Sequence, residues 1–191
     1  MTSTPTPDTT ACCIVGGGPA GMMLGYLLAR AGVHTTVLEK HADFLRDFRG
    51  DTVHPSTMRA LDELGLLAAF LQRPHQRLHT IEGCFGDEKI RLGDFSGLPA
   101  RYGFIAMMPQ WEFLDFLATQ ARALPGFSLH MQSQVTEPVF DHTQRVVGVR
   151  GHRPEGEFET TAPLTIACHG RHSTLRAAAR LPVSDIGAPI D

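Results

Sequence analysis

Three glycines near the N-terminus have the spacing of a phosphate-binding loop. Gly16, Gly18 and Gly21 form a G-x-G-x-x-G pattern directly after the apolar run at residues 11–15. In such a loop the first glycine makes a tight turn, the second lets the backbone approach a pyrophosphate, and the third lets a helix pack closely on a strand. The N-terminus of that helix also attracts phosphate. The pattern predicts a dinucleotide site formed by Gly16, Gly18, Pro19, Ala20 and Gly21.

A carboxylate at the end of the next predicted strand complements this loop. Glu39 directly follows the β-branched and apolar run at residues 34–38. A carboxylate there can accept hydrogen bonds from ribose hydroxyls, and it would repel a 2′-phosphate. We therefore expect Glu39 to bind an adenosine that carries a free 2′-hydroxyl.

The spacing of apolar residues predicts the elements that hold these groups, in an α/β fold of the Rossmann-like class. Strands are expected at 11–15 and 34–38, around a helix that runs from Ala20 to Ala31. Further along the chain we expect a helix at 55–67, a hairpin within 76–95 that turns at Gly86-Asp87, a strand at 104–108 in the hairpin's layer, and a helix at 109–121. The pattern then predicts an antiparallel meander of strands within 127–161, a short buried strand at 164–167, and a helix to Arg180 capped by Ser173 or Thr174.

Composition excludes several classes of protein. The 191 residues are 42% hydrophobic and carry a formal net charge of −3 without a long basic run, which argues against disorder and against nucleic acid as a partner. The uncharged stretch at 9–29 contains too many glycines for a membrane span. Four cysteines without a C-x-x-C pair, and an N-terminus without a basic region, favour a cytoplasmic protein with reduced thiols. Residues 1–10 are expected to form a disordered tail and 182–191 a C-terminal tail.

Five segments, taken in order, resemble the class A flavoprotein aromatic hydroxylases of the para-hydroxybenzoate hydroxylase type. They are GGGPAG, Glu39-Lys40, FRGD before PSTMRALDELGL, Pro109-Gln110, and HGRHSTLR. The resemblance runs from about residue 11 to residue 182. It implies a Rossmann-like FAD-binding domain at 11–75 and 109–181, and a partial substrate-side β layer at 76–108.

The resemblance also implies roles for single residues. Arg49 matches an arginine that reaches the FAD ribose and pyrophosphate, Gln110 matches a glutamine that contacts the flavin, and Lys40 belongs to the cofactor set through its place beside Glu39. A solvated surface charge at Arg49 and a simple helix cap at Gln110 are the alternatives. His169-Gly170 stands where the family usually has Asp-Gly, so His169 changes both the charge and the shape of that contact.

The activity implied by the resemblance is FAD-dependent monooxygenation. NAD(P)H would act as co-substrate, and O₂ would supply the oxygen atom for an aromatic or similar small molecule. A later Gly-Asp motif of the family is missing, so we expect the N-terminal portion of such an enzyme, apparently truncated, with a partner chain as one source of the missing half. No catalytic acid or base can be named.

Three other interpretations stay open at this point. One is an NAD-dependent oxidoreductase in which Glu39 binds the NAD ribose. Another is a non-catalytic FAD-binding remnant or one subunit of a split flavoenzyme. Cys168, His169 and His172 could also suggest a metal site or a thiol nucleophile, but no fourth ligand or acidic partner lies at suitable spacing.

Overall fold

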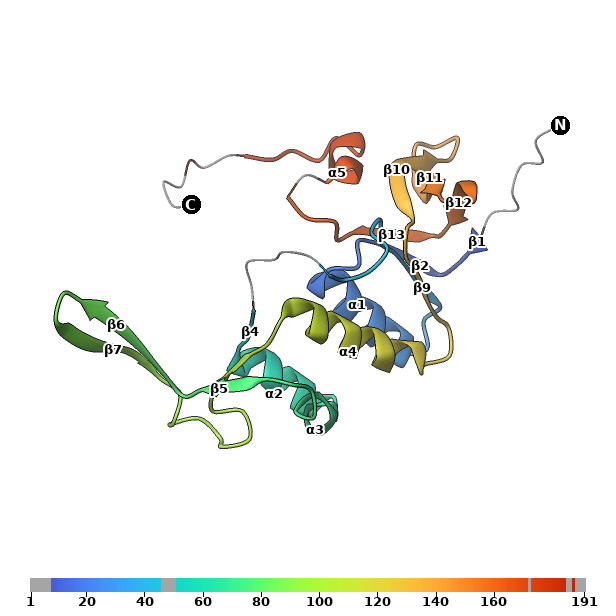
Figure 1. Cartoon of the computed structure of the whole chain (residues 1–191). Coiled ribbons are helices and arrows are strands. Elements are labelled where there is room, and N and C mark those ends of the chain that lie inside the picture. The colour runs from blue at the N-terminus through green and yellow to red at the C-terminus, as the bar shows by residue number, and fades with distance from the viewer. Residues whose placement is uncertain (1–7, 46–50, 172, 185–186, 188–191) are drawn as a thin grey trace. The chain divides into compact units, whose positions relative to one another are not determined.

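The chain divides into two compact units. The computed structural model describes residues 8–45, 51–171, 173–184 and 187 (Figure 1). The first unit comprises Met1–Asp43 and Leu117–Asp191, and the second comprises Phe44–Phe116. Helix α4, Gln110–Arg122, contains a boundary between them. The limits that the resemblance implies for the FAD-binding domain and for the substrate-side layer stay a prediction.

A four-stranded parallel sheet forms the centre of the first unit. Its order is β13-β2-β3-β9, with β2 at Cys12–Val15, β3 at Thr35–Leu38, β9 at Phe127–His130 and β13 at Leu164–Ala167. Both strands expected around the glycine loop are confirmed. The assignment of β9 to the antiparallel meander was wrong, because β9 pairs in parallel with β3. A strand that follows a crossover helix such as α4 commonly returns parallel to its sheet.

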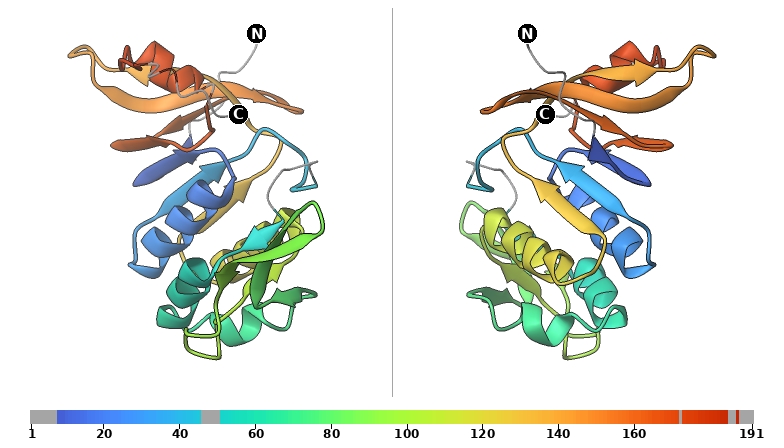
Figure 2. Two further views of the ribbon diagram at one scale, coloured as in Figure 1. Left: turned by 90° about the vertical axis from the view of Figure 1, so that its left-hand side faces the viewer. Right: turned by 90° about the vertical axis from the view of Figure 1, so that its right-hand side faces the viewer.

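Helix α1, Pro19–Arg30, covers one face of this sheet and confirms the helix predicted after the glycine loop (Figure 2). The helix approaches so closely at Gly25 that a Cβ atom there would lie 2.8 Å from Val37 Cγ2 and 2.9 Å from Phe127 Cε2. Ile14, which is paired with Val37 in the sheet, lies on the same face. A small residue in the middle of α1 therefore sets the distance between helix and sheet.

A second sheet, in the order β1-β12-β11-β10, packs on the other face. Its strands are β1 at Asp8–Thr9, β10 at Gln134–Phe140, β11 at Val146–Arg153 and β12 at Gly156–Thr161. The last three form the antiparallel meander that was expected. Asp8 and Thr9, assigned from the sequence to a disordered tail, instead pair in parallel with β12.

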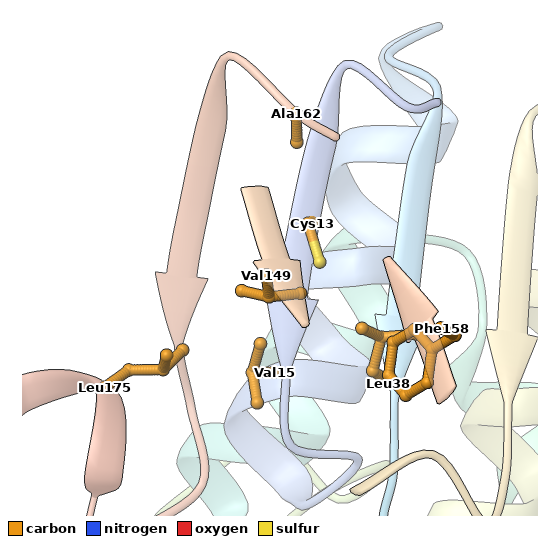
Figure 3. Close-up of a cluster of buried hydrophobic side chains, with 7 residues drawn as sticks. All are labelled: Cys13, Val15, Leu38, Val149, Phe158, Ala162 and Leu175. Carbon is orange, nitrogen blue, oxygen red and sulfur yellow. The ribbon is translucent and has the colours of Figure 1, made fainter. Parts of the chain in front are cut away.

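One apolar cluster joins the two sheets (Figure 3). The cluster takes side chains from both sheets and from α5, Thr174–Ala178, and comprises Cys13, Val15, Leu38, Val149, Phe158, Ala162 and Leu175. Cys13 and Val15 alternate with Ile14 along β2, so that strand is buried on both faces. The first unit therefore has three layers, namely α1, the parallel sheet and the second sheet.

Strand β13 differs from its expected burial. It is an edge strand of the parallel sheet, and Leu164 is 52% exposed. The apolar sequence predicted a buried strand, but an edge position leaves part of such a strand in contact with solvent. Helix α5 then begins as predicted, because the Ser173 hydroxyl accepts a hydrogen bond from the Arg176 backbone N–H at 3.1 Å.

The second unit combines short helices with two small antiparallel sheets. Its elements are β4 at Thr52–Val53, α2 at Pro55–Glu63, α3 at Leu67–Phe70, β5 at Gln76–Leu78, β6 at Thr80–Phe85, β7 at Glu88–Asp94 and β8 at Ile105–Met107. Phe70 lies at its core, with edge-to-face contacts to Phe113 and Phe116 at centroid distances of 5.9 and 5.6 Å. These contacts hold the first turns of α4 against α3.

The sequence predictions for the second unit are correct in part. The hairpin β6-β7 turns at Gly86-Asp87 as expected. Strand β8 was assigned to the hairpin's layer, but it pairs with β4 and β5 in a separate sheet. The helix expected at 55–67 begins as predicted but ends early, at Glu63, because Gly65 has a φ of +76° and ends the helical path, and the separate helix α3 begins at Leu67.

The packing of α1 generates a stability prediction. Alanine normally favours a helix over glycine, but a methyl group at Gly25 would overlap Val37 and Phe127. We expect Gly25→Ala to lower the free energy of unfolding by about 1–2 kcal/mol, measured by urea denaturation. Gly97→Ala is the control, because its new Cβ would meet no atom within 4 Å in the described part of the chain. An unchanged or higher stability of Gly25→Ala would contradict the packing described for α1.

Candidate cofactor-binding site

The three spaced glycines occupy three different environments in the turn between β2 and α1. Gly16 has a φ of +112°, and a Cβ there would lie 2.6 Å from the Cys168 carbonyl carbon. A Cβ at Gly21 would lie only 1.9 Å from the Gly16 carbonyl oxygen. A Cβ at Gly18, in contrast, would meet no atom of the described residues within 4 Å. Two of the glycines therefore close the turn, and the third leaves a space beside its backbone.

The N-terminus of α1 lies next to that space. Gly18 is the N-cap residue, and no side-chain hydrogen bond caps the helix within the described part of the chain. Pro19 is the first helical residue, where the missing N–H costs nothing. The N–H groups of the first turn and the positive end of the helix dipole can therefore serve an anion beside Gly18.

Glu39 lies beside the same turn and is only 3% exposed to solvent. Strands β2 and β3 are in parallel register with Val15 opposite Leu38, so the residues that follow them share one edge of the sheet. The Gly17 backbone N–H donates to Glu39 Oε2 at 2.7 Å. The His41 backbone N–H donates to Glu39 Oε1 at 3.0 Å, and His41 Nδ1 lies 2.5 Å from the same oxygen. The carboxylate is thus fixed in place by N–H donors.

His169 and Gly170 approach the turn from β13, the strand on the other side of β2. The Cys168 N–H donates to the Val15 carbonyl at 2.7 Å, and the His169 backbone nitrogen would lie 2.7 Å from a Cβ at Gly16. Gly170 has a φ of +90°, which favours glycine. The parallel register therefore brings these two residues to the edge of the sheet that carries the glycine turn.

The imidazole of His169 is electrostatically disfavoured in its charged form. Burial lowers the pKa of His169, the Val15 carbonyl opposes this shift, and the positive charges of Lys40 and Arg176 lower it further. Nδ1 is buried without a hydrogen bond of good geometry in the described chain, and Nε2 lies 3.4 Å from Thr174 Oγ1. His169 is consequently neutral at pH 7.

Lys40, Gln110 and Arg49 complete the set of cofactor-site residues predicted from the sequence. Lys40 is exposed and follows Glu39. Gln110 is half-buried at the start of α4, in the second unit. Arg49 lies outside the described residues. The proposed contacts of Gln110 and Arg49 with a cofactor therefore stay predictions.

Two residues beside Glu39 were missed by the reasoning from sequence. Gly17 donates to the carboxylate, and a Cβ there would lie 2.9 Å from the Glu39 Cβ. His41 contacts the other carboxylate oxygen. The third glycine in the run Gly16-Gly17-Gly18 was a signal for the first of these residues. His41 had no signal, because its contact depends on how the chain turns after β3.

A cleft of about 410 Å³ opens beside β13, within the first unit. Gly170 lines it, together with Ser173, Arg176 and a largely apolar set comprising Pro138, Val146, Ile166, Ala167, Leu175, Ala179 and Leu181. Thr165 also lines the cleft, and its Oγ1 is buried without a hydrogen-bond partner among the described residues. One wall of the cleft is thus the edge strand of the parallel sheet.

The metal and thiol alternatives find no support in the described part of the chain. No group of three or more His, Cys, Asp or Glu side chains there could hold a metal ion, and His172 lies outside it. Burial raises the pKa of the Cys168 thiol, and burial together with Cys12 raises that of Cys13 to about 12. Neither thiol is poised as a nucleophile at neutral pH. In the same described residues, no helix has both the length and the apolar character needed to cross a membrane.

A parallel sheet with a glycine turn, a free helix N-terminus and a carboxylate on the next strand defines a dinucleotide-binding α/β protein. A family model described as "FAD binding domain" matches residues 8–187. The chain therefore belongs to the FAD binding domain family, and FAD is the cofactor of that family. The match confirms the predicted fold class and cofactor, and it argues against the NAD-dependent alternative.

Relatives of known activity agree with this assignment. The chain is 31% identical over 193 residues to 6-methylpretetramide 4-monooxygenase of Streptomyces rimosus. This match covers 97% of this chain and 45% of that protein. It is 32% identical to the solved structure of the anhydrotetracycline hydroxylase OxyS from the same species, with a TM-score of 0.72, covering 89% of this chain and 33% of that one. The resemblance to flavoprotein aromatic hydroxylases is confirmed, and the chain spans less than half of either relative.

A more distant structure shows the same fold. The myxobacterial chondrochloren halogenase CndH, described as an FAD-dependent halogenase, has a TM-score of 0.79 at 23% identity, covering 90% of this chain and 40% of that one. At this identity the likeness extends to the fold alone.

The unequal environments of Gly18 and Gly21 predict opposite mutant behaviour. Gly18→Ala has room and an ordinary φ of −71°, so it should fold with a loss below about 1 kcal/mol from poorer N-capping. The methyl group would occupy the space expected for the pyrophosphate, and the FAD dissociation constant should rise about tenfold or more. Gly21→Ala should lose more than about 2 kcal/mol of stability, because its Cβ collides with the Gly16 carbonyl.

Thermal unfolding and FAD titration of both variants measure these effects. A destabilised Gly18→Ala that binds FAD normally would reverse the roles assigned to the two glycines.

Burial and the raised pKa of Cys13 predict selective labelling. At pH 8 the Cys13 thiol is protonated and inaccessible, because its pKa is about 12 and its exposed fraction is 0%. Cys84 is exposed on β6. Iodoacetamide under native conditions should label Cys84 within minutes and leave Cys13 unmodified until urea is added, as followed by peptide mass spectrometry. Equal labelling rates would show that β2 is not buried as described.

Proposed function

We propose that this chain is the FAD-binding part of an FAD-dependent monooxygenase acting on an aromatic or similar small molecule. The observation that carries the proposal is the open space beside Gly18 at the uncapped start of α1, with the Glu39 carboxylate held next to the same turn. An anion and a pair of hydroxyls, placed as they are in an adenine dinucleotide, complement these two features.

The residues of the first unit fit the adenosine and pyrophosphate portions of FAD. The Gly18 backbone and the first turn of α1 would bind the pyrophosphate. Glu39 would accept from the ribose, and Lys40 would add a positive charge near the phosphates. His169 and Gly170 would contact the cofactor mainly through their backbone, since the neutral imidazole carries no charge toward it. Arg49 and Gln110 are proposed as further contacts to the pyrophosphate and to the flavin.

Bound FAD would supply the redox chemistry, with NAD(P)H as reductant and O₂ as the source of the transferred oxygen. The part played by this chain is to bind and orient the cofactor and to exclude water from one side of it. The names of the relatives, a monooxygenase and a hydroxylase, support the transfer of an oxygen atom, and the resemblance to flavoprotein aromatic hydroxylases supports an aromatic substrate. We assign no acid or base to the reaction, because none of the described side chains has been placed beside a substrate.

A second candidate is one subunit of a split flavoenzyme. The observation in its favour is that β13 is an edge strand, unpaired on one side among the described residues, beside an apolar cleft, in a chain that spans 45% and 33% of the two relatives described above. Co-expression with the product of a neighbouring gene tests this candidate. Stable co-purification of a chain with a Gly-Asp motif supports a split enzyme, and an in-frame continuation of this gene supports one long enzyme.

The proposed ribose contact predicts a loss of affinity in Glu39→Ala. A charge-assisted hydrogen bond contributes about 1.5–3 kcal/mol, so the FAD dissociation constant should rise by about one to two orders of magnitude. Quenching of flavin fluorescence on titration measures it, and the yellow complex has the flavin absorption bands. Glu155→Ala is the control, because Glu155 is an exposed turn residue after β11. Unchanged affinity in Glu39→Ala would show that the ribose binds elsewhere, and no FAD binding by the unaltered chain would overturn the proposal.

The short span of the chain predicts an uncoupled reaction. More than half of each relative lies beyond the matched region, and we expect groups that shield the flavin from water to lie there. Supplied with FAD and NADH or NADPH, the 191-residue chain should oxidise the reductant slowly and release hydrogen peroxide in a near-equal amount. Assays of hydrogen peroxide and of hydroxylated product, with a panel of phenols as substrates, measure how much of the oxidised reductant leads to each. Stoichiometric hydroxylation with little peroxide would show that these residues suffice for the full reaction.

A further inference from the structure

We propose that His41 is a positioning residue that orients the Glu39 carboxylate toward the cofactor ribose. This inference rests on the proposed function and concerns the same site. His41 Nδ1 lies 2.5 Å from Glu39 Oε1, and the His41 backbone N–H donates to that oxygen at 3.0 Å. Both contacts act on one carboxylate oxygen, while Gly17 holds the other at 2.7 Å.

The contacts of the Glu39 carboxylate indicate that Nδ1 of His41 is the hydrogen-bond donor. A carboxylate oxygen can only accept, and two backbone N–H groups already donate to this carboxylate. Against an ionised Glu39, Nδ1 is therefore the donor of this pair. The hydrogen bond is formed with an ionised acceptor, which makes it stronger than a neutral one.

The ring acts on a carboxylate that has little other freedom. The Glu39 side chain is 4% exposed, while the His41 side chain is 41% exposed. A contact with a partly exposed ring thus restrains a buried carboxylate beside the glycine turn. Rotation of the carboxylate away from the ribose would break the His41 and Gly17 contacts together, so His41 keeps Glu39 in its accepting orientation.

The backbone around His41 is held independently of its ring. The Glu39 N–H donates to His130 O at 2.9 Å, Ser133 N–H to Glu39 O at 2.8 Å, and Gln132 N–H to His41 O at 2.9 Å. Removal of the imidazole leaves these hydrogen bonds intact. Variants at His41 should therefore keep the fold, with an unchanged unfolding midpoint, and report on the side chain alone.

Two isosteric substitutions separate the Nδ1 contact from general effects of the ring. The Asn side-chain nitrogen can occupy the place of Nδ1, whereas the Gln nitrogen corresponds to Nε2. We expect His41→Ala and His41→Gln to raise the FAD dissociation constant about tenfold, and His41→Asn to restore it to within about threefold of the unaltered chain. FAD titration of the 191-residue chain and its variants measures these values. Equal affinities in His41→Ala and the unaltered chain, or equal losses in His41→Ala and His41→Asn, would overturn the inference.

A double variant tests whether His41 acts through Glu39. If it does, His41→Ala added to Glu39→Ala should weaken FAD binding no further than Glu39→Ala alone. A residue with a merely structural role would give additive losses in the double variant, and that result would overturn the inference while leaving the proposed function in place. Failure of the unaltered chain to bind FAD would instead overturn the proposed function, and this inference with it.

Discussion

The contact between Gly21 and the Gly16 carbonyl is the constraint on which the site depends. A Cβ at Gly21 would lie 1.9 Å from that oxygen, so α1 can begin where it does only because the residue has no side chain. Gly16 in turn packs against the backbone of Cys168 and His169 at distances that also exclude a side chain. Close approach at these two glycines places the helix N-terminus at the ends of β2 and β13. The close contacts of the turn are made at Gly16 and Gly21, and this leaves the backbone at Gly18 open among the described residues.

The charges around this turn are held by partners within the chain. Burial of the Glu39 carboxylate would be costly without partners, and N–H donors from Gly17 and His41 offset that cost. Burial lowers the pKa of His169, and the positive charges of Lys40 and Arg176 lower it further. Positive charge that disfavours an imidazolium would favour a pyrophosphate at the same place. Under the proposed function, a fixed acceptor for ribose and positive charge for phosphate are thus both present around one glycine turn.

Local sequence patterns were sufficient to predict those elements that pack against the elements next to them in the chain. Strand β2, the glycine turn, α1 and β3 form one continuous unit, so their bounds and the position of Glu39 could be predicted from spacing and periodicity. The hairpin turn at Gly86-Asp87 and the Ser173 cap were predictable for the same reason, since each depends on residues a few positions apart. The resemblance to flavoprotein hydroxylases also rested on short local segments.

The class of the fold, the dinucleotide turn and its acidic partner were predictable from short segments, because each is encoded by a few residues with defined spacing. The pairing of the strands was not, because it depends on contacts between segments far apart in the chain. Strand β9 pairs in the parallel sheet and not in the meander, β8 pairs outside the sheet of the hairpin, and β13 is a partly exposed edge strand. The His41 contact was decided in the same way. Hydrogen bonds from Gln132 and Ser133, more than 90 residues away in sequence, hold the turn that brings its ring to Glu39, and no local pattern records a contact made through such a distant segment.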